Sequence, residues 1–189
     1  TGHSHMLGIE LFARAGGLGN VDAMLDPDTL TSFGAQRSGA MEKTCGVSDV
    51  IYDSYNIEPG DIMLITSNSG RNAMPIEMAM RCKKEGVYVI AMTNLEQSIA
   101  TTSRHPSGKK LYEFGDIVID NCGPHGDALI GTDGVAKVCS VSSICNNCIA
   151  QSMAARTVEL LHEDGYELPI LNGEKEHDEK MKEKYKGRA

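Results

Sequence analysis

The sequence predicts an α/β fold in which helices cover both faces of a parallel β-sheet. Residues 62–67 form a short apolar run that follows a Pro-Gly-Asp turn, and residues 87–92 and 116–120 form two further runs. Between the first two runs, residues 73–85 carry a helical pattern that Gly86 ends. Largely apolar strands that alternate with helical segments are typical of a parallel sheet buried on both faces.

Two helices are expected before these strands. Residues 6–15 have a helical pattern, residues 38–55 have a second and less regular one, and residues 16–35 show little periodicity. A helix that begins at residue 6 lacks the strand that would precede it in a β-α-β order. We therefore expect the chain to begin just after a first strand.

Two further elements are expected after the core strands. Residues 128–138 indicate a short pair of strands around an Asp-Gly turn, and residues 140–162 form the longest helical stretch. In this helix Ile144 and Cys148 are expected on the apolar side.

The composition is that of an ordinary folded domain. Of the 189 residues, 41% are hydrophobic and 23% are charged, which is enough for one domain over residues 1–172. Residues 173–189 form a charged tail, which indicates either a solvated helix or a frayed end. The formal net charge of −8 argues against nucleic acid or an anionic membrane as the main partner, because phosphate backbones attract basic surfaces. No apolar run approaches the roughly 20 residues that span a bilayer, so we expect a cytoplasmic protein.

Six cysteines invite a disulfide or a metal interpretation. Only Cys145 and Cys148 have the spacing of metal ligands, and no second pair of ligands follows them at zinc-finger distance. Because both lie in a predicted helix, a role as small buried apolar groups is favoured over a metal or redox role. We expect reduced thiols and no bound metal.

The loop Ser67-Asn68-Ser69-Gly70-Arg71-Asn72 is the first candidate site. It follows a predicted strand and opens a predicted helix, where free backbone N–H groups and the helix dipole favour an anion. The serine hydroxyls add donors, and the glycine lets the backbone approach a ligand closely. An ordinary helix N-cap is the alternative interpretation.

Two more helix starts are rich in hydroxyl groups. Thr1-Gly2-His3-Ser4-His5 precedes the first predicted helix, and Ser140-Val141-Ser142-Ser143 opens the longest one. Ligands of open α/β sheets bind at the carboxyl ends of the strands, where such loops gather. Three hydroxyl-rich helix starts in one domain are hard to attribute to capping alone.

The candidates for acid–base chemistry are two glutamates and three histidines. Glu42 and Glu77 lie in predicted helices, where a solvated surface glutamate is the alternative for each. His105 and Arg104 lie in a polar loop after a strand, where the arginine can assist a phosphate and the histidine can equally be a turn residue. His3 and His5 have no third ligand nearby that would complete a metal site.

The sequence resembles the sugar isomerase (SIS) domain family. The resemblance rests on Ser-Asn-Ser-Gly-Arg-Asn-Ala-Met-Pro-Ile-Glu-Met-Ala within residues 62–92, and it covers nearly the whole chain. More specifically, the sequence resembles a bacterial branch of SIS domain-containing, phosphoheptose-isomerase-like proteins. The stretches that carry this resemblance are Gly2-His-Ser-His-Met6, Arg14-Ala-Gly-Gly17, Ser103-Arg-His-Pro-Ser-Gly108 and Lys184-Tyr-Lys-Gly-Arg188. The last loop, residues 139–143, departs from that branch's usual threonine-containing pattern.

The resemblance implies a flavodoxin-like three-layer αβα sandwich with a five-stranded parallel sheet, in a homodimer or homotetramer. It implies a sugar-phosphate site whose phosphate lies at Ser67, Ser69 and Asn72. By analogy, Glu42 would be the base of an isomerisation, and His105 or His3 would be the acid that opens the sugar ring. Together with the loops above, the binding candidates are Gly2, Ser4, Ser67, Asn68, Ser69, Gly70, Asn72, Arg104, Ser140, Ser142 and Ser143.

Two functions fit this site, and the first is favoured. One is a cofactor-independent aldose–ketose isomerase that acts on a sugar phosphate or an amino-sugar phosphate. The other is a non-catalytic module that senses a sugar phosphate, because both share the fold and the phosphate loop. A metalloprotein that uses His3, His5 or the pair Cys145 and Cys148 is a third, less favoured alternative.

Overall fold

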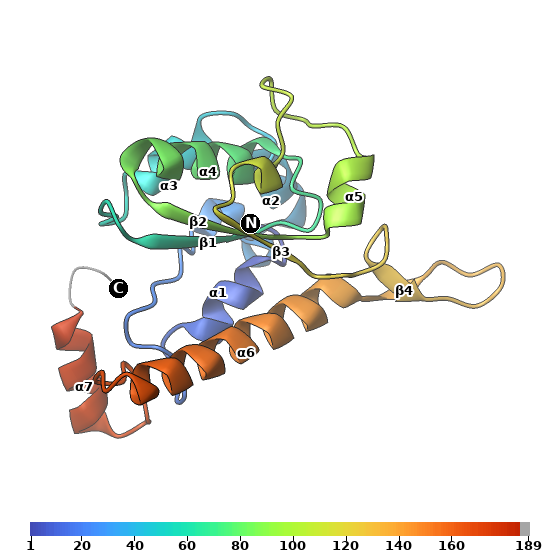
Figure 1. The fold of residues 1–189 in the computed structure, drawn as a ribbon. Coiled ribbons are helices and arrows are strands. Elements are labelled where there is room, and N and C mark those ends of the chain that lie inside the picture. Colours follow the sequence, from blue (N-terminus) through green and yellow to red (C-terminus); the bar gives the residue numbers. More distant parts are fainter. Residues whose placement is uncertain (186–189) are drawn as a thin grey trace.

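The computed structural model describes residues 1–185 and has a mixed α/β fold around a parallel sheet. Strands β1 (Ile62–Thr66), β2 (Tyr88–Thr93) and β3 (Ile117–Asp120) lie side by side in that order. Both neighbouring pairs are parallel, with Leu64 opposite Ile90 and Ile90 opposite Ile117. The carboxyl ends of all three strands therefore meet at one edge of the sheet, as Figure 1 shows.

Helices α3 (Val47–Tyr52) and α4 (Ala73–Glu85) cover one face of the sheet (Figure 1). Their buried side chains pack with Ile65, Val89 and Ala91 in one hydrophobic cluster. Helix α4 begins after the extended Asn72 and ends at Gly86, whose φ of +77° is a left-handed conformation that glycine adopts without strain. The local signals predicted for this helix therefore set its two ends.

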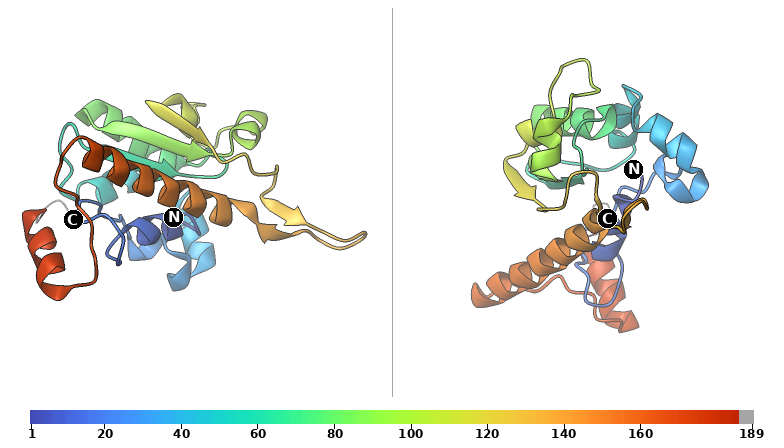
Figure 2. Two further views of the ribbon diagram at one scale, coloured as in Figure 1. Left: turned by 60° about the horizontal axis from the view of Figure 1, so that its bottom comes forward. Right: turned by 90° about the vertical axis from the view of Figure 1, so that its right-hand side faces the viewer.

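Helices α1 (His5–Leu11) and α6 (Val141–Glu163) cover the opposite face (Figures 1 and 2). Leu7 of α1 and Ala150 of α6 pack against Met92 of β2. Met92 and its chain neighbour Ala91 thus lie in different clusters, because successive side chains of a strand point to opposite faces. The described residues form three layers, with the sheet in the middle.

The remaining elements surround this sandwich. Short helices α2 (Ala35–Met41) and α5 (Leu95–Ala100) and three 3-10 turns lie in the connections; the turns are η1 (Pro27–Thr29), η2 (Thr31–Phe33) and η3 (Leu111–Glu113). Strands β4 (Ala128–Ile130) and β5 (Val138–Ser140) form an antiparallel hairpin that projects beyond the sandwich in Figure 2. Helix α7 (Lys175–Lys184) ends the described chain, so the last part of the charged tail, residues 186–189, lies outside the described residues. Within residues 1–185 no helix is long and apolar enough to cross a membrane.

Most of the predicted elements are present, and several differ in detail. The described chain contributes three strands to the main sheet, so the five-stranded sheet stays a prediction. The single helix predicted over residues 38–55 is wrong: α2 ends at Met41, and α3 begins after Gly46, whose φ is +86°. Glycine adopts this left-handed conformation without strain, so the chain can turn at Gly46 between the two helices.

The apolar side of α6 is also different from the prediction. Ile144 is 62% exposed and Cys148 is exposed, whereas Asn146, Ala150 and Ala154 face the sheet. Small side chains let α6 approach the sheet and α1 closely, and the asparagine is buried because its amide is hydrogen-bonded. Hydrophobicity alone therefore misassigned Ile144 and Cys148, whereas Met153, predicted on the same side, does pack against the core.

Candidate functional site

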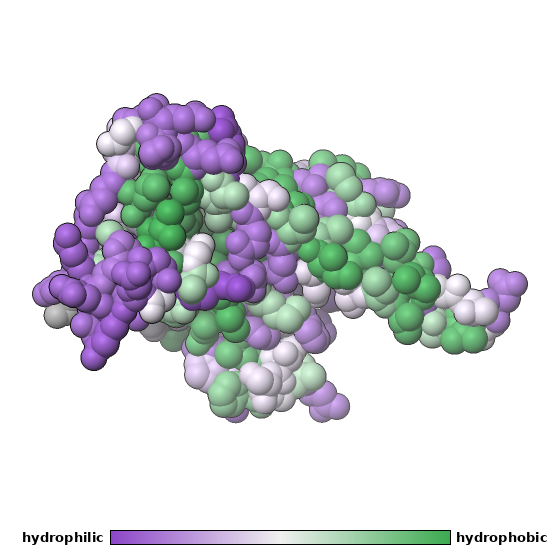
Figure 3. Space-filling model, turned by 90° about the horizontal axis from the view of Figure 1, so that it is seen from below, coloured by the Kyte–Doolittle hydropathy of each residue, from purple (hydrophilic) through white to green (hydrophobic). Residues whose placement is uncertain are grey.

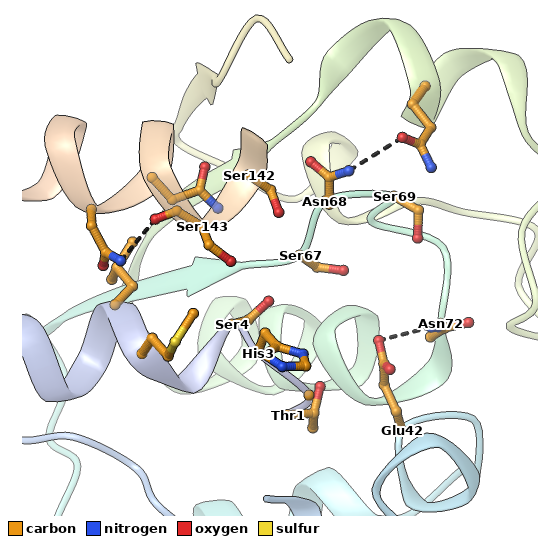
Figure 4. Close-up of a pocket in the computed structure, with 16 residues that line it drawn as sticks. Thr1, His3, Ser4, Glu42, Ser67, Asn68, Ser69, Asn72, Ser142 and Ser143 are labelled. Atoms are coloured by element: carbon orange, nitrogen blue, oxygen red, sulfur yellow. Dashed lines mark hydrogen bonds between the residues drawn. The ribbon is translucent and has the colours of Figure 1, made fainter. Parts of the chain in front are cut away.

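A polar pocket of about 260 Å³ lies at the carboxyl edge of the sheet. The loop after β1, the segment before α1 and the first turn of α6 meet there, and Figure 4 shows their side chains around one space. The lining residues are Thr1, Gly2, His3, Ser4, Met6, Leu7, Glu42, Ser67, Asn68, Ser69, Asn72, Gln97, Ser142, Ser143, Asn146 and Asn147. Five chain segments far apart in the sequence thus form one site at the place where open α/β sheets bind ligands.

The loop between β1 and α4 is shaped by its own hydrogen bonds. The backbone N–H of Ser67 donates to the carbonyl oxygen of Met92 at 3.0 Å, and the N–H of Gly70 donates to Ser67 Oγ at 3.2 Å. Gly70 has a φ of +56°, and a Cβ there would lie 3.0 Å from Ser98 Oγ. Only glycine fits this backbone without strain, so the loop turns sharply beneath the pocket.

Several donors in the pocket have no protein partner. Within residues 1–185, the hydroxyls of Ser4, Ser69 and Ser143 and the backbone N–H groups of Asn68 and Ser69 make no hydrogen bond to protein atoms. In Figure 4 the labelled serines surround the same space. Unused donors at the start of α4, a helix of 13 residues, suit a ligand with several anionic oxygens.

Ser142 is already engaged. Its hydroxyl donates to one carboxylate oxygen of Asp127 at 2.8 Å, and its backbone N–H donates to the other at 2.6 Å. Asp127 therefore caps the first turn of α6 from the loop before β4, as acidic side chains do at helix starts. Of the two predicted serines that line the pocket on α6, Ser143 is the free one.

A network of carboxamide side chains supports the pocket from below. Asn121 donates to Asn68 Oδ1 at 2.9 Å and to Asn146 Oδ1 at 3.0 Å. Asn146 donates to Thr66 Oγ1, and Asn68 donates to Gln97 Oε1, each at 3.2 Å. These amides tie the ends of β1 and β3 to α5 and α6, so the loop between β1 and α4 is held by interactions from four elements.

The acidic group of the pocket is Glu42. Its carboxylate accepts a hydrogen bond from Asn72 Nδ2 at 2.7 Å, and Asn72 Oδ1 accepts one from Arg104 at 2.9 Å. Figure 4 shows Glu42 and Asn72 at one end of the pocket, with His3 and Ser4 on the side of α1. The buried Asn72 fixes the Glu42 carboxylate through one oxygen, Oε1. The other carboxylate oxygen of Glu42 makes no bond to Asn72.

Comparisons with known proteins place this chain in a family. A family model described as SIS domain matches residues 1–94. UPF0309 protein TTE0306 of Caldanaerobacter subterraneus subsp. tengcongensis is 38% identical over 195 residues, which cover 99% of this chain and 79% of that protein. The chain belongs to the UPF0309 group of SIS domain proteins.

Further relatives of the same group are similar over comparable lengths. UPF0309 protein BH3325 of Halalkalibacterium halodurans is 39% identical over 172 residues, which cover 90% of this chain and 71% of that protein. UPF0309 protein GK1441 of Geobacillus kaustophilus is 37% identical over 193 residues, with 99% and 77% covered. The similarity to these SIS domain proteins thus extends well beyond the residues that the family model matches.

Most of the predicted site residues meet in this SIS pocket, and a few lie outside its lining. The predicted residues that line it are Gly2, His3, Ser4, Glu42, Ser67, Asn68, Ser69, Asn72, Ser142 and Ser143. Gly70, Arg104, His105 and Ser140 are not among the lining residues. Arg104 reaches the site through Asn72, and Ser140 precedes α6 as its exposed N-cap.

Sequence reasoning missed part of the amide lining. Gln97 lies on α5, a helix of six residues that is too short for periodicity to predict. Asn146 and Asn147 lie inside the predicted long helix, between Cys145 and Cys148. Two adjacent asparagines in a helix interior were the available signal, because asparagine is disfavoured there without a specific partner.

The cysteines and histidines that are candidates for metal binding have other environments in the structure. All six cysteines are free; Cys145 is half-buried and Cys148 is exposed, so the prediction of a buried Cys148 is wrong. His5 Nδ1 hydrogen-bonds to the carbonyl oxygen of Gly2. The described residues contain a different cluster that could hold a metal ion, and it includes none of Cys145, Cys148, His3 and His5.

Proposed function

We propose that the pocket binds a sugar phosphate, with the phosphate at the start of α4 and the sugar between α1, α6 and Glu42. The main support is a group of hydrogen-bond donors without protein partners around one space of about 260 Å³. They belong to Ser4, Asn68, Ser69 and Ser143. This volume is slightly below the range of about 300–1,000 Å³ typical of small-molecule sites, which favours a monosaccharide phosphate over a dinucleotide. Membership of the SIS domain family supports the same ligand class.

We further propose that the protein is a cofactor-independent aldose–ketose isomerase. Interconversion through an enediol needs a base that moves a proton between two neighbouring carbons. Glu42 supplies a carboxylate in the pocket, fixed by Asn72, and His3 supplies an imidazole from the segment before α1 for ring opening. The role of His105 in ring opening stays a prediction, since its side chain lies outside the pocket lining. A cytoplasmic location is part of the same proposal.

The alternative is a module that binds the sugar phosphate without converting it. Among the described side chains that line the pocket, Glu42 and His3 are the acid–base groups. Recognition of a ligand by hydrogen bonds needs no acid–base group, whereas acid–base catalysis requires both Glu42 and His3 to reach the substrate.

Binding and turnover can be tested separately. The melting temperature is measured with a panel of aldose and ketose phosphates, with the unphosphorylated sugars and inorganic phosphate as comparisons. Ser69→Ala is expected to lose most of the stabilisation by the ligand, whereas Ser54→Ala, whose hydroxyl donates to Val50 on α3, is expected to keep it. If no sugar phosphate shifts the melting temperature of the folded protein, the binding proposal fails.

Turnover is followed by NMR in D2O, where isomerisation replaces a carbon-bound proton by deuterium. Glu42→Gln is expected to retain binding and to lower the rate by about 10²- to 10⁴-fold, the usual contribution of a general base. Glu159→Gln on the exposed side of α6 serves as the matched control. Binding without any exchange in the wild-type protein would favour the sensor over the isomerase.

A further inference from the structure

Cys45, Glu77 and His105 form a cluster beside the sugar-phosphate pocket. Each offers one ligand atom, and the three atoms lie within 4.8 Å of one another. Cys45 lies in the connection between α2 and α3, Glu77 on the second turn of α4, and His105 in the loop that follows α5. None of them lines the pocket, so the proposed function does not account for their convergence.

The distance between His105 and Glu77 matches that of two ligands in a tetrahedral metal site. His105 Nε2 and Glu77 Oε1 are 3.4 Å apart, which is longer than an ordinary N–H···O hydrogen bond. Two ligands at zinc-bond lengths of about 2.0–2.1 Å in a tetrahedron lie about 3.3–3.4 Å from each other. Thiolate, imidazole and carboxylate are the ligand types that zinc combines in proteins.

Neighbouring groups orient the ligands toward the centre of the cluster. His105 Nδ1 accepts the backbone N–H of Ser107 at 3.2 Å and lies 2.7 Å from Ser107 Oγ, which leaves Nε2 facing Glu77. Zinc at Nε2 requires the ring proton on Nδ1, from where it can be donated to Ser107 Oγ. The second carboxylate oxygen of Glu77 accepts the backbone N–H of Gly46 at 2.7 Å, which leaves Oε1 free for the cluster. Partners of this kind on the outer side of a ligand are typical of metal sites.

Burial at the cluster is uneven in a way that suits an open site. The His105 and Glu77 side chains are only 10% and 17% exposed, whereas Cys45 is exposed. The pKa of the Cys45 thiol is raised, first by desolvation and then by the neighbouring Glu77, so the metal-free cysteine is a thiol at neutral pH. A bound cation would displace that proton, as metals do when they bind cysteine.

We propose that Cys45, Glu77 and His105 bind one zinc ion, with the fourth position open to solvent. The ion joins the segment after α2 and the loop after α5 to α4. Glu42 lies three residues before Cys45, and Arg104 precedes His105, so the ion fixes both chain segments that hold the Glu42–Asn72–Arg104 interaction. This site lies outside the lining of the proposed sugar-phosphate pocket, and a His105 that binds zinc leaves His3 as the acid that opens the ring.

Zinc binding is measured under reducing conditions by competition with a chromogenic chelator. The expected result is one equivalent per wild-type chain, with affinity reduced by more than about tenfold in each of Cys45→Ser, Glu77→Gln and His105→Asn. Cobalt provides a second readout, because a cysteine ligand gives a sulfur-to-cobalt charge-transfer band. That band is expected to disappear in Cys45→Ser.

Matched controls separate this site from accidental binding. Cys148→Ser removes an exposed cysteine on α6, and His125→Asn removes an exposed histidine after β3; both are expected to keep the zinc and the cobalt band. Circular dichroism verifies that each variant is folded. The proposal is overturned if the folded wild-type protein binds no stoichiometric zinc, or if the three ligand variants bind zinc as tightly as the wild type.

Discussion

At the scale of single residues, the site depends on a few side chains whose positions are fixed by hydrogen bonds. Asn72 is buried, and its amide holds Glu42 with its nitrogen and Arg104 with its oxygen. It lies at the N-cap position of α4, yet its side chain makes no capping bond. The residue is thus used to position the carboxylate of Glu42 and not to start the helix.

Replacing Asn72 by alanine is expected to lower the free energy of unfolding by about 1–3 kcal/mol, because the buried site loses two hydrogen bonds and leaves their partners unpaired. The measurement is urea unfolding, with Gln36→Ala on the exposed surface of α2 as the control. An effect no larger than that of Gln36→Ala would show that the Asn72 amide does not support the site.

At the scale of elements, one aspartate joins three parts of the sandwich. Asp116 stands just before β3; its carboxylate accepts the backbone N–H of Val89 in β2 at 2.8 Å and pairs with Lys83 near the end of α4. The pKa of Asp116 is lowered, first by the hydrogen bond from Lys83 and next by that from Val89. The start of β3 is therefore fixed by an ionised group.

This lowered pKa predicts a pH dependence with a definite sign. The folded protein holds the Asp116 proton less tightly than the unfolded chain, so the stabilisation is complete above the usual aspartate pKa of about 3.9 and is lost as the pH falls through the folded value. Wild type should accordingly be more stable than Asp116→Asn at pH 6, and the difference should shrink in acid.

Urea unfolding at a series of pH values between neutral and acid measures the difference. Asp133→Asn, in the exposed turn of the β4–β5 hairpin, is expected to leave the pH profile of wild type unchanged. A difference between wild type and Asp116→Asn that is the same at every pH would contradict an electrostatic origin.

At the scale of the whole molecule, an apolar surface extends along the β4–β5 hairpin to α6. Leu129, Ile130, Val135 and Val138 of the hairpin and Ile144 of α6 are all more than half exposed. Figure 3 shows hydrophobic surface continuing from α6 onto the hairpin. An isolated two-stranded hairpin is only marginally stable in water, and exposed apolar patches mark contact sites.

We expect a second copy of this chain to cover that surface, in line with the homodimer or homotetramer that the family resemblance implies. Ile130 and Val138 are directly opposite each other in the hairpin, so Ile130→Ser with Val138→Ser removes apolar surface from one face. Sedimentation should give an oligomer for wild type and a smaller mass for the double variant.

Val50→Ser is the control for this experiment, because Val50 is equally exposed but lies on α3, on the other side of the sheet. It is expected to leave the mass unchanged. A monomeric wild type, or a double variant with the mass of wild type, would contradict the hairpin interface.

The sequence by itself determined the features that depend on near neighbours in the chain. The three core strands, helix α4 and the hairpin follow from local periodicity and turn residues, and they were predicted within one or two residues. The serine-rich loop between β1 and α4 was likewise readable, because a strand, a glycine and a helix start stand next to one another at residues 62–73. Membership of the SIS domain family was also evident from its motifs.

Only the tertiary structure decided which distant side chains meet. It brought Gln97 and Asn146 to the loop between β1 and α4, turned Ile144 outward, and placed Cys45 and Glu77 beside His105. These outcomes depend on how helices and loops pack across the sheet, and helical periodicity carries no information about which partner lies opposite a given face. Local propensity therefore gave the elements, while long-range packing selected the members of each site.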